Sequence, residues 1–206
     1  MANTIFAVLT ALVLSFHSMH ARAETVQVAT NVYHAGIDET RFQFLSAPQT
    51  LGRQQQSNWC WAASAKMVLN YYGIPITQTQ IVSYVFGLPV DQPGGSKEIL
   101  RALNNGFSTI TGERVQVRAA LLDPTKSAEW VPFLENGQPL IVGLAGAATN
   151  VPGHAYVLKS IVFSRVPGGV IVHSLTLADP WPTSPVETTL GWDEFMRRQL
   201  GLYIVH

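Results

Sequence analysis

The single cysteine of this chain, Cys60, lies where a helix is expected to begin. Apolar residues recur at helical spacing from Ala62 to Tyr72, and Gly73 with Pro75 ends the pattern. Unpaired N–H groups and the helix dipole stabilise an anion at a helix N-terminus, so this position favours a thiolate. A thiolate paired with an imidazole is an effective nucleophile near neutral pH. The alternative is that Cys60 is a small, buried apolar side chain without chemistry.

A histidine and an aspartate stand at the ends of two expected strands. His154 precedes the expected strand 155–166, Asp179 follows the expected strand 170–177, and a Pro-Gly-Gly turn at 167–169 joins them. Because hairpin strands are antiparallel, the start of one lies beside the end of the next. We therefore expect His154 and Asp179 to be neighbours, with the carboxylate orienting the imidazole toward a nucleophile.

The other histidines are weaker candidates. A lone histidine on an apolar strand is more often structural than catalytic, and this alternative applies to His154 taken by itself. His173 is the rival base, but it stands in mid-strand, so we expect a packing role for it. Apart from His17 and His20, which lie within N-terminal residues 1–23, the sequence has no His-x-x-His or His-Glu-x-x-His spacing, so we expect no metal site.

Two further features complete a recognisable order of residues. Gln54 stands six residues before Cys60, which is flanked by Trp59 and Trp61. With His154 and an Asp-Pro-Trp segment downstream, the order resembles papain-like cysteine peptidases. Within them, the chain is similar to the small bacterial secreted or effector type with a WCWAA nucleophile segment, over residues 50–205.

The resemblance implies a role for each matching residue. Cys60 would be the nucleophile and His154 the base, with Asp179 where the family usually has Asn. Gln54 and the main-chain N–H of Cys60 would bind the oxyanion. Trp181 would shield the imidazole–carboxylate bond from water, and Gly94 with Gly95 would bind the extended substrate backbone. The family's Cys-Gly-Ser-Cys-Trp segment is replaced by residues 57–61, so its structural half-cystine is absent.

Patterning predicts the elements that must position these residues. We expect helices over 60–72, from the Thr77–Gln80 capping box to about Phe86, and over 96–103, 129–136 and 192–198. Ser96 is the expected cap of the third helix. We expect strands in 24–50, 115–122, 140–144 and 202–205 besides the hairpin. Helices first and an antiparallel sheet second predict an α+β fold, papain-like, with a central helix led by the cysteine.

The composition of the chain excludes several classes of protein and of site. The chain has 206 residues, with 13 Lys and Arg against 13 Asp and Glu, and only 13% are charged. It therefore lacks the basic footprint of a nucleic-acid-binding protein. A lone cysteine excludes an internal disulfide and a multi-cysteine metal site.

The N-terminus indicates export. An apolar run from Ile5 to Phe16 precedes Ala21-Arg22-Ala23, the pattern of a secretory signal peptide over residues 1–23. The alternative is a buried N-terminal helix. No cysteine follows the run, so we expect no lipid anchor. The expected organisation is then a signal peptide at 1–23, a short lead segment at 24–50 and one papain-like domain at 51–206, in the periplasm or outside the cell.

These observations predict a secreted thiol peptidase with a Cys-His-Asp triad, an acyl-enzyme intermediate and no cofactor. Acyl transfer, deamidation or cell-wall peptide amidase activity would use the same machinery. A secreted binding or effector module with a decayed site is the non-enzymatic alternative. We expect a monomer that acts on polypeptides, and an inhibitor or immunity protein is a further candidate partner.

Overall fold

The computed structural model describes residues 25–46, 52–148 and 152–206. The expected signal peptide, residues 1–23, lies outside this range, as do residues 24 and 47–50 of the expected lead segment. Among the described residues, no helix is both long and apolar enough to cross a membrane.

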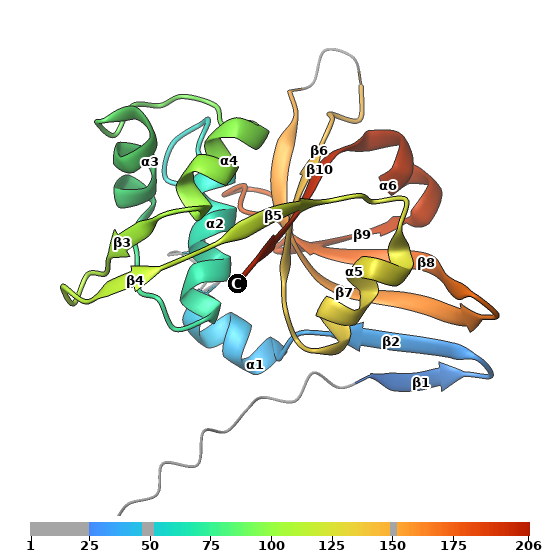
Figure 1. Ribbon diagram of the computed structural model, residues 1–206. Coiled ribbons are helices and arrows are strands. Elements are labelled where there is room, and N and C mark those ends of the chain that lie inside the picture. The colour runs from blue at the N-terminus through green and yellow to red at the C-terminus, as the bar shows by residue number, and fades with distance from the viewer. Residues whose placement is uncertain (1–24, 47–51, 149–151) are drawn as a thin grey trace, which may run out of the picture.

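The first half is helical and surrounds the helix that begins at the cysteine (Figure 1). Its elements are α2 (Cys60–Tyr71), α3 (Gln78–Phe86), α4 (Ser96–Leu103), β3 (Gly106–Ser108) and β4 (Arg114–Gln116). Thr77 and Gln80 form the predicted capping box at the start of α3. Most of α2 is buried, including Trp61 and Met67, because the helix is rich in Ala and has Lys66 as its only charged residue. The core therefore fixes α2 firmly, and with it Cys60.

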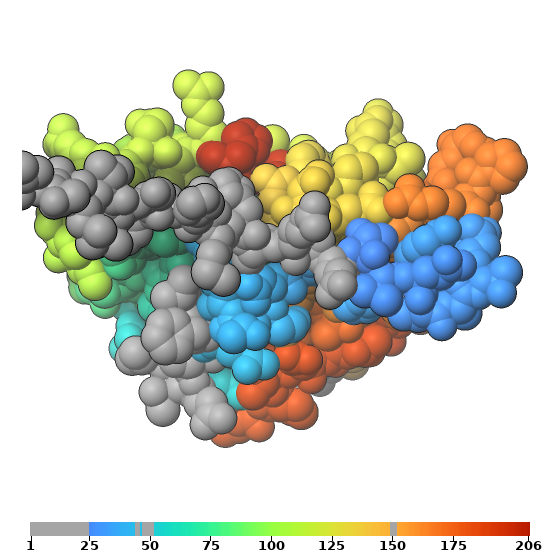
Figure 2. Space-filling model, turned by 90° about the horizontal axis from the view of Figure 1, so that it is seen from below, coloured from blue at the N-terminus to red at the C-terminus, as the bar shows by residue number. Residues whose placement is uncertain are grey.

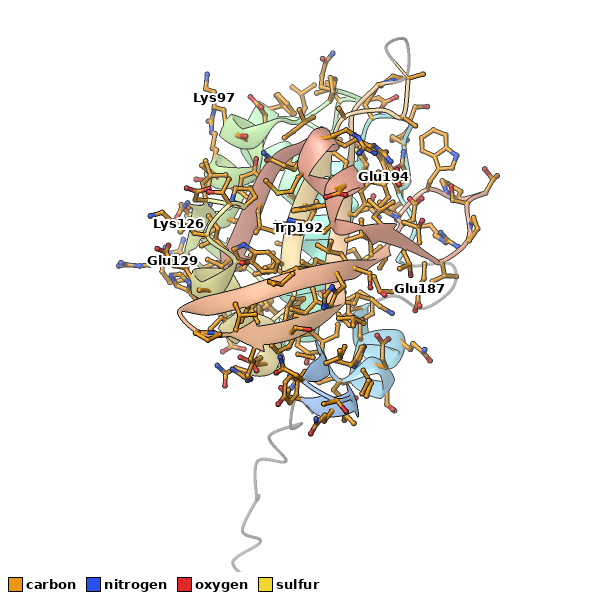
Figure 3. The ribbon with its side chains drawn as sticks, turned by 90° about the vertical axis from the view of Figure 1, so that its right-hand side faces the viewer. Lys97, Lys126, Glu129, Glu187, Trp192 and Glu194 are labelled. Atoms are coloured by element: carbon orange, nitrogen blue, oxygen red, sulfur yellow. The ribbon has the colours of Figure 1, made fainter. Side chains whose placement is uncertain are left out.

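The second half is an antiparallel sheet flanked by two short helices (Figure 1). Its elements are β5 (Ala119–Leu122), α5 (Ser127–Glu135), β6 (Leu140–Leu144), β7 (His154–Val166), β8 (Gly169–Ala178), β9 (Glu187–Gly191), α6 (Trp192–Arg198) and β10 (Gln199–Val205). The long strand β7 pairs with β6 through its first part and with β8 along most of its length. Trp192 of α6, labelled in Figure 3, stacks on Trp130 of α5, and the ring centroids are 6.1 Å apart. The predicted α+β, papain-like architecture is confirmed.

The segment before residue 51 contributes to the same sheet and core. It forms β1 (Val26–Ala29), β2 (Val32–Gly36), α1 (Glu39–Arg41) and a π-helical turn (Phe42–Ser46). β2 pairs with residues 160–164 of β7, and Figure 2 shows β1 and β2 in blue against the orange strands. The strands expected within residues 24–50 are β1 and β2, whereas the chain from Glu39 to Ser46 forms helical turns that begin at the cap residue Asp38.

An ion pair connects this segment to the sheet. Lys159 of β7 is almost fully buried, and its ammonium group contacts the carboxylates of Glu39 and Glu187. Glu187 lies on the side of the sheet nearest α1 (Figure 3). The same ammonium lies 5.3 Å from the ring of buried Phe42. The connection therefore joins α1, β7 and β9 around one buried cation.

Two further expectations about the elements differ from the structure. The run 115–122 is two strands, because β4 pairs with β3 whereas β5 pairs with β10. Gly95, not Ser96, caps α4, since the Gly95 N–H donates to the Glu98 carboxylate at 2.9 Å. The Ser96 hydroxyl is instead hydrogen-bonded to the hydroxyl of Tyr203.

Candidate active site

Cys60 is the first residue of α2 and is partly buried. Burial raises the pKa of its thiol, but the hydrogen bond and charge of His154 and the N–H groups of Ala155 and Trp61 outweigh this and lower the pKa below its ordinary value. No side chain caps α2, and the first N–H groups of a helix have no intrahelical acceptor. The main-chain N–H of Cys60 therefore remains available to a ligand.

His154 lies between the thiol and a carboxylate. Its Nε2 is 2.8 Å from Oδ1 of Asp179, and its side chain is also hydrogen-bonded to Cys60. Burial lowers the pKa of this imidazole, but the hydrogen bonds to Asp179 and Cys60 and their charges raise it to about 9. Burial also opposes ionisation of Asp179, yet hydrogen bonds from His154, the Trp181 N–H and Ser184 lower its pKa. The three groups therefore favour a thiolate, an imidazolium and a carboxylate.

Aromatic rings hold the imidazole in place. Tyr156, two residues along β7, meets His154 edge-on with centroids 4.6 Å apart. Trp181 meets it at 6.0 Å and an interplanar angle of 75°. The indole of Trp181 is 40% exposed, so one side faces the imidazole and the other faces solvent. Trp181 therefore lies beside the imidazole, and the shielding role that the resemblance implies for it stays a prediction. Tyr156 was not predicted, because its position in an apolar strand is typical of a core residue.

A cleft of about 690 Å³ opens beside the cysteine and is lined from both halves of the molecule. Cys60 and Gly94 line it from the helical half, and His154, Asp179 and Trp181 line it from the sheet half. An adjoining hollow of about 300 Å³ has mainly apolar walls that include Ile99, Leu200 and Tyr203. The Cys60 thiol therefore faces a groove large enough for a peptide segment.

The two predicted substrate-binding glycines differ in how they are packed. Gly94 lies against the indole of Trp61, and a Cβ there would be 2.5 Å from ring atom Cδ2. Gly95 has only Glu98 Oε2 nearby, which would lie 3.7 Å from a Cβ at this position. Both line the apolar hollow, but Gly95 does not line the larger cleft. Gly94 alone is therefore required by close packing, and it brings the loop next to Cys60.

The structure places Gln54 near the site but uses its amide elsewhere. The side-chain Nε2 donates to the carbonyls of Gln56 and Ser57, both at 2.9 Å. Gln54 lines a separate hollow of about 340 Å³ that it shares with Trp181, and it does not line the cleft around Cys60. An oxyanion role for Gln54 therefore requires Nε2 to exchange one of these carbonyls for the substrate.

Two other sequence expectations can be compared with the structure. His173 is exposed on β8 and its ring lies 2.8 Å from the Ser164 hydroxyl, so the expected packing role is wrong and it lies away from Cys60. The outward direction follows from alternation, because its neighbour Val172 is buried. No cluster of three or more His, Cys, Asp or Glu side chains suited to a metal ion occurs among the described residues.

A comparison of the sequence with models of protein families identifies one family that matches this chain. The model of the family described as papain-like cysteine protease AvrRpt2 matches residues 41–198, which is more than half of the chain. This range contains Cys60, His154 and Asp179. A search of curated proteins gave no match.

Proposed function

We propose a function from the family to which this chain belongs, the AvrRpt2 family of papain-like cysteine proteases. The chain is an exported thiol peptidase with a Cys60–His154–Asp179 triad. One observation carries this proposal. The imidazole of His154 is hydrogen-bonded both to the only thiol of the chain and to the Asp179 carboxylate, in an open cleft. An isolated buried cysteine would have neither partner.

The geometry supports acyl-enzyme chemistry. The Cys60 thiolate attacks the carbonyl carbon of the scissile peptide, and the Cys60 N–H stabilises the oxyanion. The His154 imidazolium gives its proton to the leaving amine, which leaves a thioester and a neutral imidazole. His154 then takes a proton from water as it attacks the thioester, and release of the acid restores the thiolate–imidazolium pair. Asp179 keeps the imidazole oriented throughout, and Gln54 is the proposed second oxyanion donor.

The apolar hollow indicates which kind of substrate side chain lies next to the scissile bond. Its walls include Ile99 and Leu200, and it adjoins Cys60 and His154. An apolar substrate side chain would lose its contact with water there, which is favourable, and it would not bury a polar wall group without a hydrogen-bond partner. We therefore propose that peptides with a hydrophobic residue close to the scissile bond are preferred.

Product analysis tests the reaction itself. A library of proteome-derived peptides would be incubated with the wild-type chain in ¹⁸O-labelled water and analysed by mass spectrometry. Cleavage with ¹⁸O at the new C-termini, absent with Cys60→Ala, is expected of a peptidase. Equal cleavage by Cys60→Ala would refute the proposal. Ligated peptides would instead indicate acyl transfer, and a gain of about three daltons without cleavage, as an ¹⁸O hydroxyl replaces the amide NH₂, would indicate deamidation.

Export rests on residues 1–23, whose apolar run and Ala21-Arg22-Ala23 site are typical of a signal peptide. Expression in a bacterial host followed by fractionation and N-terminal sequencing tests this. We expect protein beginning at Glu24 in the periplasm or the medium. An uncleaved chain confined to the cytoplasm would contradict export and leave the peptidase proposal intact.

A further inference from the structure

Arg53 reaches from the segment before the nucleophile to the loop that carries Asp179. Its Nη1 donates to the carbonyls of Asp179 at 2.8 Å and Trp181 at 2.7 Å, and its Nη2 donates to that of Ser184 at 3.1 Å. A planar guanidinium can hold several acceptors in one fixed arrangement, which a single ammonium group cannot. Arg53 therefore gathers three carbonyls of one short loop around one rigid group.

These three carbonyls belong to the residues that determine the state of the Asp179 carboxylate. Trp181 donates its main-chain N–H to Asp179 Oδ1 at 2.8 Å, and this oxygen also contacts His154. A hydrogen bond from the Ser184 side chain is a further cause that lowers the pKa of Asp179. Arg53 thus binds Asp179 and both of the loop residues that donate to its carboxylate.

Arg53 is itself anchored in the helical half. Gln78, the fully buried first residue of α3, donates from Nε2 to the Arg53 carbonyl at 2.7 Å and accepts from the Gln55 N–H at 3.0 Å. Next to Arg53, the Gln54 N–H donates to the Pro180 carbonyl at 2.8 Å. The acid loop of the sheet half is therefore tied through Arg53 to the half that carries Cys60.

We propose that Arg53 is a positioning residue for the reaction: by clamping the 179–184 loop it holds the Asp179 carboxylate against His154. The proposal rests on the proposed triad, and Arg53 acts through Asp179 without touching the substrate. Without the clamp, the loop samples other conformations and the carboxylate spends less time on the imidazole. The imidazolium is then less stabilised, and the thiolate that depends on it is less populated.

The rate of Cys60 alkylation by iodoacetamide as a function of pH tests this without a substrate. We expect Arg53→Ala to raise the apparent pKa of the thiol by about one unit, which lowers the alkylation rate by about tenfold at pH values well below the wild-type pKa, where the rate follows the thiolate fraction. The apparent thiol pKa of Arg53→Lys should lie between those of the wild type and Arg53→Ala, because one ammonium group cannot hold all three carbonyls. Arg165→Gln is the matched control, since Arg165 is exposed, pairs with Glu135 and lies at the turn end of the β7–β8 hairpin, opposite the end that carries Asp179.

A double-mutant cycle separates positioning from a general effect on stability. Combined with Asp179→Ala, the Arg53→Ala change should slow alkylation by less than about twofold more, because its target is gone. An additive, roughly tenfold further loss would overturn the proposal. If Arg53→Ala does not fold, the same comparison is made with Arg53→Lys, and a wild-type profile in that variant overturns it.

The outcomes distinguish this proposal from the one on which it rests. A perturbed thiol in the wild type with an unchanged profile in Arg53→Ala overturns the role of Arg53 alone. A wild-type thiol that titrates at the ordinary value of about 8.5 overturns the triad and the role of Arg53 together.

Discussion

His154 Nε2 and Asp179 Oδ1 lie 2.8 Å apart, across the open end of the β7–β8 hairpin. His154 is the first residue of β7, Asp179 follows the last residue of β8, and both lie just beyond Val157 and Ala178, the last residues that pair across the hairpin. The register of two long, well-paired strands therefore sets the distance between the base and the acid. The position of Cys60 is set separately, by the buried helix α2.

Replacing Asp179 should change the pH range of activity as well as its size. Asp179→Ala removes a hydrogen bond and a charge that raise the His154 pKa. The alkaline limb of the pH–rate profile, where activity is lost as His154 is deprotonated, should therefore move below about 9. We expect kcat/KM for a cleaved peptide to fall by about ten- to hundredfold. Asp179→Asn keeps an acceptor for the imidazole but no charge, so it should lose less activity and still shift the limb. A pH–rate profile checks both effects, and an unshifted limb in Asp179→Ala would refute this role.

The two neighbouring glycines should respond differently to a methyl group. Gly94→Ala places Cβ 2.5 Å from the rigid, buried Trp61 indole, so the loop must move. We expect a loss of about 1–3 kcal/mol in the free energy of unfolding and a higher KM. Gly95→Ala is the matched control, because its nearest neighbour is the flexible end of Glu98 at 3.7 Å. Urea denaturation and peptide kinetics test this, and equal effects of the two substitutions would contradict it.

Lys159 should be important for stability and not for chemistry. Lys159→Ala empties a buried volume and releases Glu39 and Glu187, which should lower the free energy of unfolding by about 2–4 kcal/mol. Lys159→Met fills most of that volume and should cost less than half as much. Equilibrium urea denaturation measures the difference, with Cys60 alkylation of the folded protein as the readout that should stay unchanged. A fully stable Lys159→Ala would show that the N-terminal segment does not depend on this ion pair.

Local sequence signals predicted the elements that carry the site. The apolar spacing after Cys60 gave α2, and the turn at 167–169 gave a hairpin whose Gly168 adopts the positive φ of 85° that such a turn needs. These features depend on residues close in sequence, so one chain is enough to find them. The meeting of His154 and Asp179 then follows from antiparallel pairing alone.

Contacts between distant segments left no comparable signal. Arg53 is bonded to residues more than 120 positions away, and nothing in the Arg-Gln-Gln-Gln segment indicates a clamp. The amide of Gln54 turns onto nearby carbonyls, which its position six residues before the cysteine does not reveal. Likewise, the pairing of β2 with β7 depends on the folded sheet and not on the weak alternation near residue 32.

The central claim is a thiolate–imidazolium pair, and the most direct test is the rate of Cys60 alkylation against pH in the wild type and His154→Ala. His154 supplies the hydrogen bond and charge that lower the pKa of the thiol, whereas burial alone raises it. We predict that the wild-type thiol reacts well below pH 7 and that His154→Ala shifts its reactivity to pH 8.5 or above, close to the ordinary value of about 8.5. Identical profiles at that ordinary value, or a folded thiol that does not react at any pH, would contradict the account.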